Sequence, residues 1–144
     1  MSSLLATKMR ETTDAFVKGW EAWKVEPIMA VRAPGCIMAQ RPASMGVPVR
    51  NNEEFASWFA NVEGMLSNCK MTVLDYFAST EERRAFLHCT MVADRNPGTY
   101  ENEYVFALSF DETGEKITRI FEMIDSQRVR EAWSDVPQVE MKRD

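Results

Sequence analysis

Hydrophobic residues recur every three to four positions in the first part of the chain, which is the spacing of one helical face. In residues 4–24 this stripe comprises Leu5, Met9, Thr12, Phe16, Trp20 and Trp23. The segment EPIMAVRAPGC, residues 26–36, predicts a second and shorter helix, because Pro27 suits a first helical turn and Pro34 ends the helix. We therefore expect the chain to begin with helices.

A third helix is predicted over residues 51–66. Asn51 can cap its N-terminus, and Glu54, three residues later, completes the pattern of a capping box. The hydrophobic stripe of this helix consists of Phe55, Phe59, Val62 and Leu66. Before it, the prolines and glycines of residues 35–50 forbid a long helix, so we expect a short strand and an ordered loop there.

The second half of the chain changes to β-branched and aromatic residues, which favour strands. The predicted strands cover residues 69–79, 83–94, 99–111 and 116–126. RNPG and DETGEK, at 95–98 and 111–116, are typical turn sequences, so consecutive strands should form an antiparallel meander. The last segment, residues 127–144, predicts a short helix and a polar tail with a mobile tip.

Helices followed by a meander predict an α+β fold, in one domain spanning residues 1–144. One face of the sheet must be buried against the helices. If the sheet is strongly curved, the two layers enclose a cone whose hollow interior suits a small ligand. We therefore expect N-terminal helices packed on a strongly curved antiparallel sheet.

Composition and charge narrow the classes of partner. The formal net charge is −5 and the basic residues are scattered, which disfavours nucleic-acid binding. No apolar run has the length of a membrane span, and the N-terminus lacks a basic segment followed by an apolar one. We expect a cytoplasmic protein that binds neither nucleic acid nor membrane.

Cysteine and histidine are too few and too dispersed to predict a metal centre. Cys36, Cys69 and Cys89 lie far apart, and His88 is the only histidine. We expect buried thiols rather than disulfides or reactive groups.

The strand GTYENEYVFALSF, residues 98–110, sends polar aromatic residues to the same face as core residues. By strand alternation, Tyr100, Asn102 and Tyr104 share a face with the apolar residues that follow. A phenol can donate to a carbonyl oxygen or stabilise an enolate; the alternative is a core tyrosine with a satisfied hydroxyl. We predict that this face passes from a packed core into a pocket wall.

The next strand carries two acidic candidates. Glu122 lies between Ile120 and Ile124 on one strand face. Burial there would raise the pKa of its carboxyl towards neutrality, which suits a general acid or base, whereas a shifted register would expose it. Asp125 has the opposite parity, so it reaches a pocket only through a bulge and is otherwise a strand-end or dimer contact.

Other candidates come from several elements, each with a structural alternative. Arg32 could anchor a substrate oxygen or pair with Glu122, or stabilise a helix end. His88 could approach Tyr104 or Glu122, or be a structural residue between apolar neighbours. The remaining candidates for the pocket wall, each with packing or surface exposure as the alternative, are Trp20, Met38, Gln40, Arg41, Phe59 and Tyr76.

Three segments, IMAVRAPGCIMAQRPASMG, GTYENEYVFALSF and RIFEMIDS, together resemble the fungal SnoaL-like isomerases and cyclases of secondary metabolism, within the NTF2-like superfamily. These include the meroterpenoid ring-remodelling isomerases and the brevianamide semipinacolase. The resemblance covers residues 8–133. It implies a cone-shaped pocket, a homodimer, and acid/base chemistry without a cofactor on a polycyclic natural product.

The resemblance also assigns positions. It places Arg32, Tyr100, Tyr104 and Glu122 in the pocket wall. Several meroterpenoid members carry a histidine where this chain has Met38; if that histidine is catalytic there, either the chemistry or its proton carrier differs here.

We therefore predict a cofactor-independent isomerase or cyclase acting on a hydrophobic polyketide, meroterpenoid or alkaloid intermediate. Glu122 would move a proton, while Tyr100, Tyr104 and Arg32 would hold oxygen atoms. Rearrangement, ring expansion, proton shift and cyclisation are all compatible with these residues. The alternatives are a dehydratase or hydrolase on the same fold, and a non-catalytic small-molecule-binding or dimerisation module.

Overall fold

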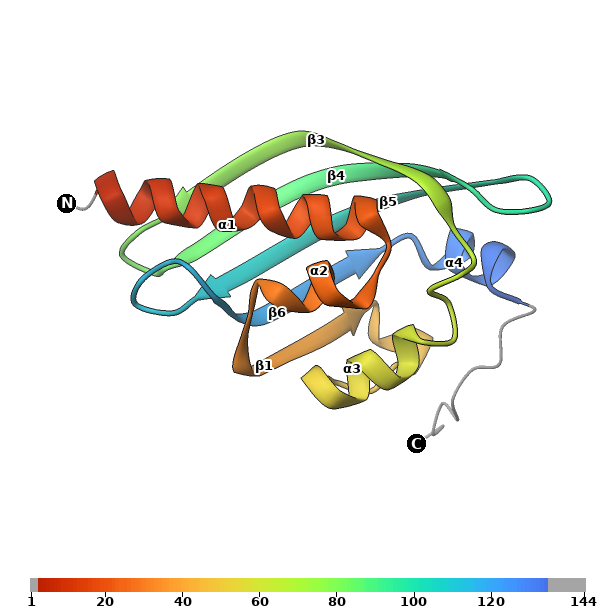
Figure 1. The fold of residues 1–144 in the computed structure, drawn as a ribbon, viewed down its shortest axis with the longest axis horizontal. Helices are drawn as coiled ribbons and strands as arrows, with labels where there is room; N and C mark the ends of the chain where they lie inside the picture. Colours follow the sequence, from red (N-terminus) through yellow and green to blue (C-terminus); the bar gives the residue numbers. More distant parts are fainter. Residues whose placement is uncertain (1–2, 135–144) are drawn as a thin grey trace.

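The computed structural model describes residues 3–134, in which helices cover one face of a curved six-stranded sheet (Figure 1). The first helix, α1 (Ser3–Ala22), buries the predicted stripe, including Met9, Phe16 and Trp20. α2 (Val25–Ala30) folds back against α1. Gly19 permits this approach, because a Cβ there would lie 2.9 Å from the Pro27 carbonyl oxygen.

The second helix is shorter than the sequence predicts. α2 ends at Ala30, and β1 (Arg32–Arg41) begins two residues later, so Pro34 lies in a strand and does not end a helix. The pairing register of β1 shifts between Arg32 and Ile37. This irregularity accommodates Pro34, which has no backbone N–H for a sheet hydrogen bond.

The third helix, α3 (Asn52–Phe59), begins with the predicted capping box. The Asn51 side chain accepts from the Glu54 backbone N–H at 2.8 Å, and the Glu54 carboxylate accepts from the Asn51 N–H at 3.0 Å. A 3₁₀ turn (Ala43–Met45) and β2 (Arg50–Asn51) precede it. α3 ends earlier than predicted, although Val62 and Leu66 beyond it are still buried.

The predicted meander is confirmed. Its strands are β3 (Ser67–Ser79), β4 (Arg84–Asp94), β5 (Thr99–Phe110) and β6 (Ile117–Ile124), and each pairs antiparallel with the next. The sheet order is β2-β1-β6-β5-β4-β3. β1 joins β6 in parallel, which the sequence pattern did not indicate, and this pairing sets Gln40 opposite Glu122.

A short helix, α4 (Ser126–Ala132), follows β6 as predicted. The Asp125 carboxylate caps it by accepting from the N–H groups of Gln127 and Arg128. The predicted mobile tail falls in residues 135–144, outside the described residues.

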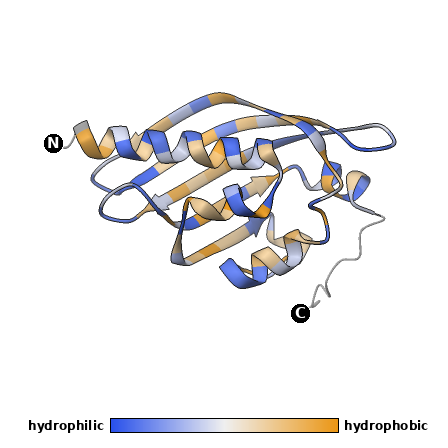
Figure 2. Ribbon diagram, in the orientation of Figure 1, coloured by the Kyte–Doolittle hydropathy of each residue, from blue (hydrophilic) through white to orange (hydrophobic). Residues whose placement is uncertain are grey.

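Side chains alternate between the two faces of the sheet, as the bands of hydrophobic and hydrophilic residues along the strands indicate (Figure 2). On β5 the buried residues are Tyr100, Asn102, Tyr104, Phe106, Leu108 and Phe110. This confirms the predicted parity of the strand, and it places the inward side chains of β5 against the helical layer.

Candidate active site

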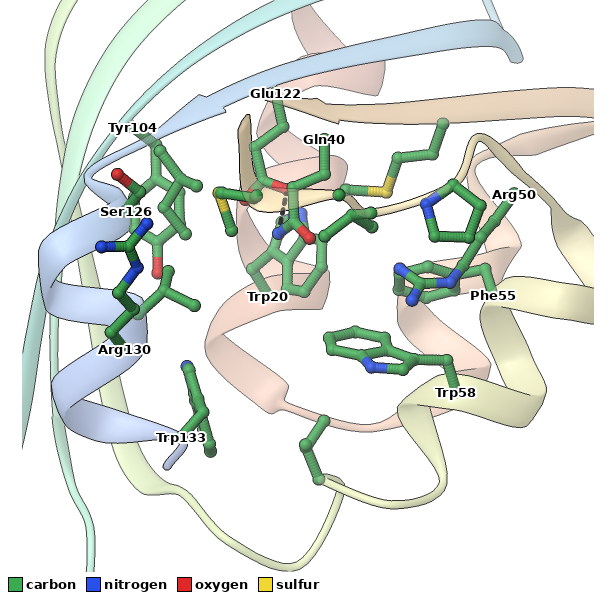
Figure 3. Close-up of a pocket in the computed structure, with 18 of the residues that line it drawn as sticks. Trp20, Gln40, Arg50, Phe55, Trp58, Tyr104, Glu122, Ser126, Arg130 and Trp133 are labelled. Carbon is green, nitrogen blue, oxygen red and sulfur yellow. Dashed lines mark hydrogen bonds between the residues drawn. The ribbon is translucent and has the colours of Figure 1, made fainter. Parts of the chain in front are cut away.

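A cavity of about 1400 Å³ lies between the helices and the inner face of the sheet (Figure 3). Its walls come from α1, α3 and α4, from the segment 43–50, and from the inner faces of β1, β3, β4, β5 and β6. All four tryptophans line it: Trp20 on α1, Trp23 just after α1, Trp58 on α3 and Trp133 just after α4. Such an aromatic enclosure favours a flat, largely apolar ligand.

Glu122 contributes a buried carboxyl group to the sheet side of this cavity and is only 3% exposed. Its Oε2 accepts a hydrogen bond of 3.0 Å from the Gln40 side-chain amide, which comes from the paired position on β1. Burial raises the pKa of Glu122 to about 7, against the opposing effects of the Gln40 hydrogen bond and of the Arg32 and Arg50 charges. A carboxyl with this pKa can both take and return a proton near neutral pH.

Two phenols lie on the adjacent strand. The hydroxyl oxygens of Tyr100 and Tyr104 are 2.7 Å apart, and either can donate to the other. Burial raises the pKa of both side chains, so both are neutral hydrogen-bond donors. Since Phe106 pairs with Glu122, Tyr104 is the diagonal neighbour of Glu122 on the same face.

Asn102 holds the Tyr100 phenol in place by a hydrogen bond. Its Nδ2 donates to the Tyr100 hydroxyl at 3.0 Å and lies 3.4 Å from the Asp125 carbonyl oxygen, while its Oδ1 accepts from the Glu103 N–H. Asn102 does not itself line the cavity. Its predicted place on the inner face is confirmed, but its predicted place in the pocket wall is wrong, because its side chain is hydrogen-bonded to Tyr100 and to the backbone.

Arg32 is buried and does not line the cavity, so its predicted place in the pocket wall is wrong. Its guanidinium lies 4.0 Å from the ring centroid of Phe55, and Nη2 is 3.5 Å from the Met38 sulfur. Nε and Nη1 have no hydrogen-bond partner among the described residues. Burial lowers the pKa of Arg32 to about 10. The guanidinium therefore stays charged at neutral pH and acts on Glu122 as a buried positive charge.

His88 does not lie at the predicted site. His88 lies on the outer face of the sheet, where its Nε2 is 2.5 Å from the Glu103 carboxylate. The prediction that His88 approaches Tyr104 or Glu122 is wrong, because it pairs with Val105 and has the parity of the outer face. The inner face at this point is occupied by the flanking residues Leu87 and Cys89.

The remaining candidates divide between the cavity and its surroundings. Trp20, Met38 and Gln40 line the cavity as predicted. The candidates that do not line it are Phe59 in the aromatic core, Tyr76 beneath the Arg10 guanidinium, Arg41 at the end of β1, and Asp125 in its capping role. The predicted place of these four residues in the pocket wall is therefore wrong: Arg41 has the parity of the outer face, Asp125 is turned towards the start of α4, and Phe59 and Tyr76 pack elsewhere.

Sequence reasoning missed Arg50 and Arg130, which line the cavity from β2 and from α4 (Figure 3). Arg50 follows an irregular loop and Arg130 belongs to a short polar helix, so neither stands in a periodic pattern. No local signal marks such residues, because only the folding of β2 and α4 against the cone brings them to the cavity.

Among the described residues, no group of three or more histidine, cysteine or acidic side chains could hold a metal ion. Cys36 and Cys89 are buried thiols as expected, and burial raises the pKa of both. None of the described helices is both long and apolar enough to cross a membrane.

Comparison with known proteins agrees with the fold. No family model matches the chain. The protein named monooxygenase AacuP from Aspergillus aculeatus is 31% identical over 120 residues, which are 83% of each chain.

Among solved structures, BvnE pinacolase from Penicillium brevicompactum superposes with a TM-score of 0.84 at 19% identity, covering 91% of this chain and 92% of that one. AusH from Aspergillus nidulans superposes with a TM-score of 0.78 at 25% identity, covering 83% of this chain and 85% of that one. The chain therefore belongs to the fungal SnoaL-like, NTF2-like enzymes of secondary-metabolite biosynthesis.

Proposed function

We propose that this protein is a cofactor-independent isomerase or cyclase that shifts a proton within a hydrophobic polyketide, meroterpenoid or alkaloid intermediate bearing a carbonyl or enol. The observation that carries the proposal is Glu122, a buried carboxyl with a pKa of about 7 that faces a cavity of about 1400 Å³. A carboxyl held in this way costs folding free energy, which a purely structural role would not require.

The geometry supports a division of labour. The Glu122 carboxylate takes a proton from a carbon next to the substrate carbonyl, and the Tyr104 hydroxyl donates a hydrogen bond to the enolate oxygen that forms. The protonated Glu122 then returns the proton to a different carbon, so the product has the same composition as the substrate. Gln40 keeps the carboxylate directed during both transfers through its 3.0 Å hydrogen bond.

The tyrosine pair can strengthen this hydrogen bond. When Tyr100 donates to Tyr104, the Tyr104 hydrogen is free for the substrate oxygen. The Asn102 amide in turn donates to Tyr100 at 3.0 Å, so the three groups form a chain of donors that ends in the cavity. Each donor in such a chain polarises the next, which stabilises developing negative charge on the substrate.

The test is to delete the gene in the native host and restore it as wild type, Glu122→Gln or the outer-face control Glu103→Gln. We expect the deletion and Glu122→Gln strains to accumulate an isomer of the next pathway product, and the control to restore the pathway. The accumulated compound, incubated with purified wild-type protein, should convert without added cofactor.

The composition of the product distinguishes the alternatives. Loss or gain of water would indicate a dehydratase or hydrolase, and gain of one oxygen would agree with the name monooxygenase that the relative from Aspergillus aculeatus carries. Either result, or full restoration by Glu122→Gln, would refute the proposed isomerisation. An unchanged pathway after deletion would favour the non-catalytic alternative.

We also propose that the outer face of the sheet joins two copies of the chain. Phe77 is 60% exposed there and stacks on Phe86. Along this face the register sets Arg84 at one end and Glu101 towards the other, so a twofold axis between the ends brings opposite charges together. A dimer mass by light scattering that Phe77→Lys reduces to a monomer would agree; a monomeric wild type would contradict it.

A further inference from the structure

Two guanidinium groups in the cavity wall have no part in the proton transfer described above. Arg50 projects from β2 beside Phe55 and Trp58, and Arg130 projects from α4 on the opposite side of the cavity (Figure 3). Within residues 3–134, neither side chain forms an ion pair or a hydrogen bond. The cavity therefore presents two cations from facing walls with their donors unused.

Arg50 is held in a conformation suited to binding an anion. Its guanidinium carbon lies 4.8 Å from the ring centroid of Trp58, so the planar group packs against the indole. The nearby Glu54 carboxylate already accepts from the Asn51 backbone N–H. A planar guanidinium supported on one face, with its N–H edge free, matches the two oxygens of a carboxylate or of an acidic enol.

The acidic side chains in the wall offset only part of the positive charge. They are Glu54, whose carboxylate attracts Arg50 and also accepts from the Asn51 N–H, and Glu122, which lies on the sheet floor and is partly protonated at neutral pH. Burial lowers the pKa of Arg50, but as an arginine it remains charged. Of the two cations, Arg50 is partly buried and loses part of its hydration, whereas Arg130 is exposed. The partly desolvated guanidinium of Arg50 therefore gains most from a ligand that carries negative charge.

We propose that the cavity selects a substrate with an anionic oxygen group, a carboxylate or an acidic enol, bound by Arg50 and Arg130 while the ring system lies among the tryptophans. The position of the reacting carbonyl, at Tyr104 and Glu122, rests on the proposed function. The anion site does not depend on that function. Arg50 and Arg130 are then binding residues that orient a polycyclic substrate and exclude neutral analogues of the same shape.

Two pairs of probes test the proposal, each an anion with a neutral analogue: naphthoic acid with acetonaphthone, and lawsone with its methyl ether. Quenching of the cavity tryptophans reports binding to the whole chain. We expect wild type to bind the anionic member of at least one pair about tenfold more tightly, the equivalent of one charged hydrogen-bonded contact. The first pair reports a carboxylate preference and the second an enol preference.

The variants assign the effect to the two arginines. Arg50→Gln should reduce the preference to less than about threefold, and Arg130→Gln should reduce it in the same direction, with unchanged affinity for the neutral probes. Arg128→Gln is the matched control, because Arg128 lies on the same helix, pairs with Glu131 and does not line the cavity. Unchanged neutral binding shows that the cavity is intact in each variant.

Equal affinity of wild type for anion and neutral analogue, no binding of either anion, or a preference retained in both variants would overturn the proposal. The binding test and the test of the proposed proton transfer can fail independently of each other. If Glu122→Gln abolishes turnover while the anion preference is absent, the catalytic proposal stands alone. If the preference depends on Arg50 but Glu122→Gln retains turnover, the anion site stands alone.

Discussion

Glu122 and Glu103 lie on neighbouring strands of one sheet but on opposite faces, and they behave as different chemical groups. Glu122 is 3% exposed and its pKa is raised by burial to about 7. The Glu103 side chain is 59% exposed and contacts His88. Neither the residue type nor the local strand sequence separates the two. The helical layer does, because it covers only one face and removes water from it.

The largest effect should come from removing the inner carboxyl. Glu122→Gln keeps the shape and the hydrogen bond to Gln40 but cannot accept a proton, so turnover of the pathway intermediate should fall about 10²- to 10⁴-fold. Glu103→Gln should change it by less than about twofold, since an exposed carboxylate loses little on neutralisation. Equal losses in steady-state assays would remove the distinction between the two faces.

A smaller loss should follow from the phenols. Tyr104→Phe removes the donor to the substrate oxygen and should lower turnover about 10- to 100-fold with little change in fold. Tyr100→Phe leaves that donor in place but removes its 2.7 Å contact, so its effect should be smaller. A larger loss in Tyr100→Phe than in Tyr104→Phe would reverse the assigned order of the two residues.

The pKa of Glu122 also predicts how stability depends on pH. The folded state holds this proton more tightly than the unfolded chain, whose pKa is 4.5. The protonated carboxyl therefore favours folding at low pH, and this stability is lost as pH rises from 4.5 through 7 and then levels off. Over the whole window the loss is about 3 kcal/mol, because each unit between the two pKa values is equivalent to about 1.4 kcal/mol.

The matched measurement is urea unfolding of wild type and Glu122→Gln across this pH window. The variant lacks the titrating group, so its stability relative to wild type should increase with pH by about 3 kcal/mol across the window. A constant difference between the two proteins would mean that Glu122 titrates normally and is not desolvated in solution.

The smallest effect is expected on the outer face. His88→Gln breaks the contact with Glu103, but exposed ion pairs contribute less than about 1 kcal/mol. Turnover should stay within about twofold of wild type, because the sheet separates His88 from the cavity. A large loss of turnover with normal thermal stability would place His88 back in the catalytic machinery.

Local patterns predicted most of the fold. The stripe that buries Met9 and Phe16, the capping box of Asn51 and Glu54, and the turns of the meander depend on neighbours within a few residues. The parallel pairing of β1 with β6 and the strand at Pro34 depend on contacts between distant segments. These were not predictable from periodicity, because no short stretch of sequence contains both partners.

The candidate site also combines features that local sequence predicts with features that only tertiary contacts set. The sequence alone determined that Glu122, Tyr100 and Tyr104 share the buried face, because strand alternation is a local property and apolar neighbours mark that face. Only the tertiary structure decided that Gln40 meets Glu122, that Arg32 does not line the cavity and that His88 faces outward. Register between strands and the packing of helices on one face set these contacts, and both form only when the whole chain folds.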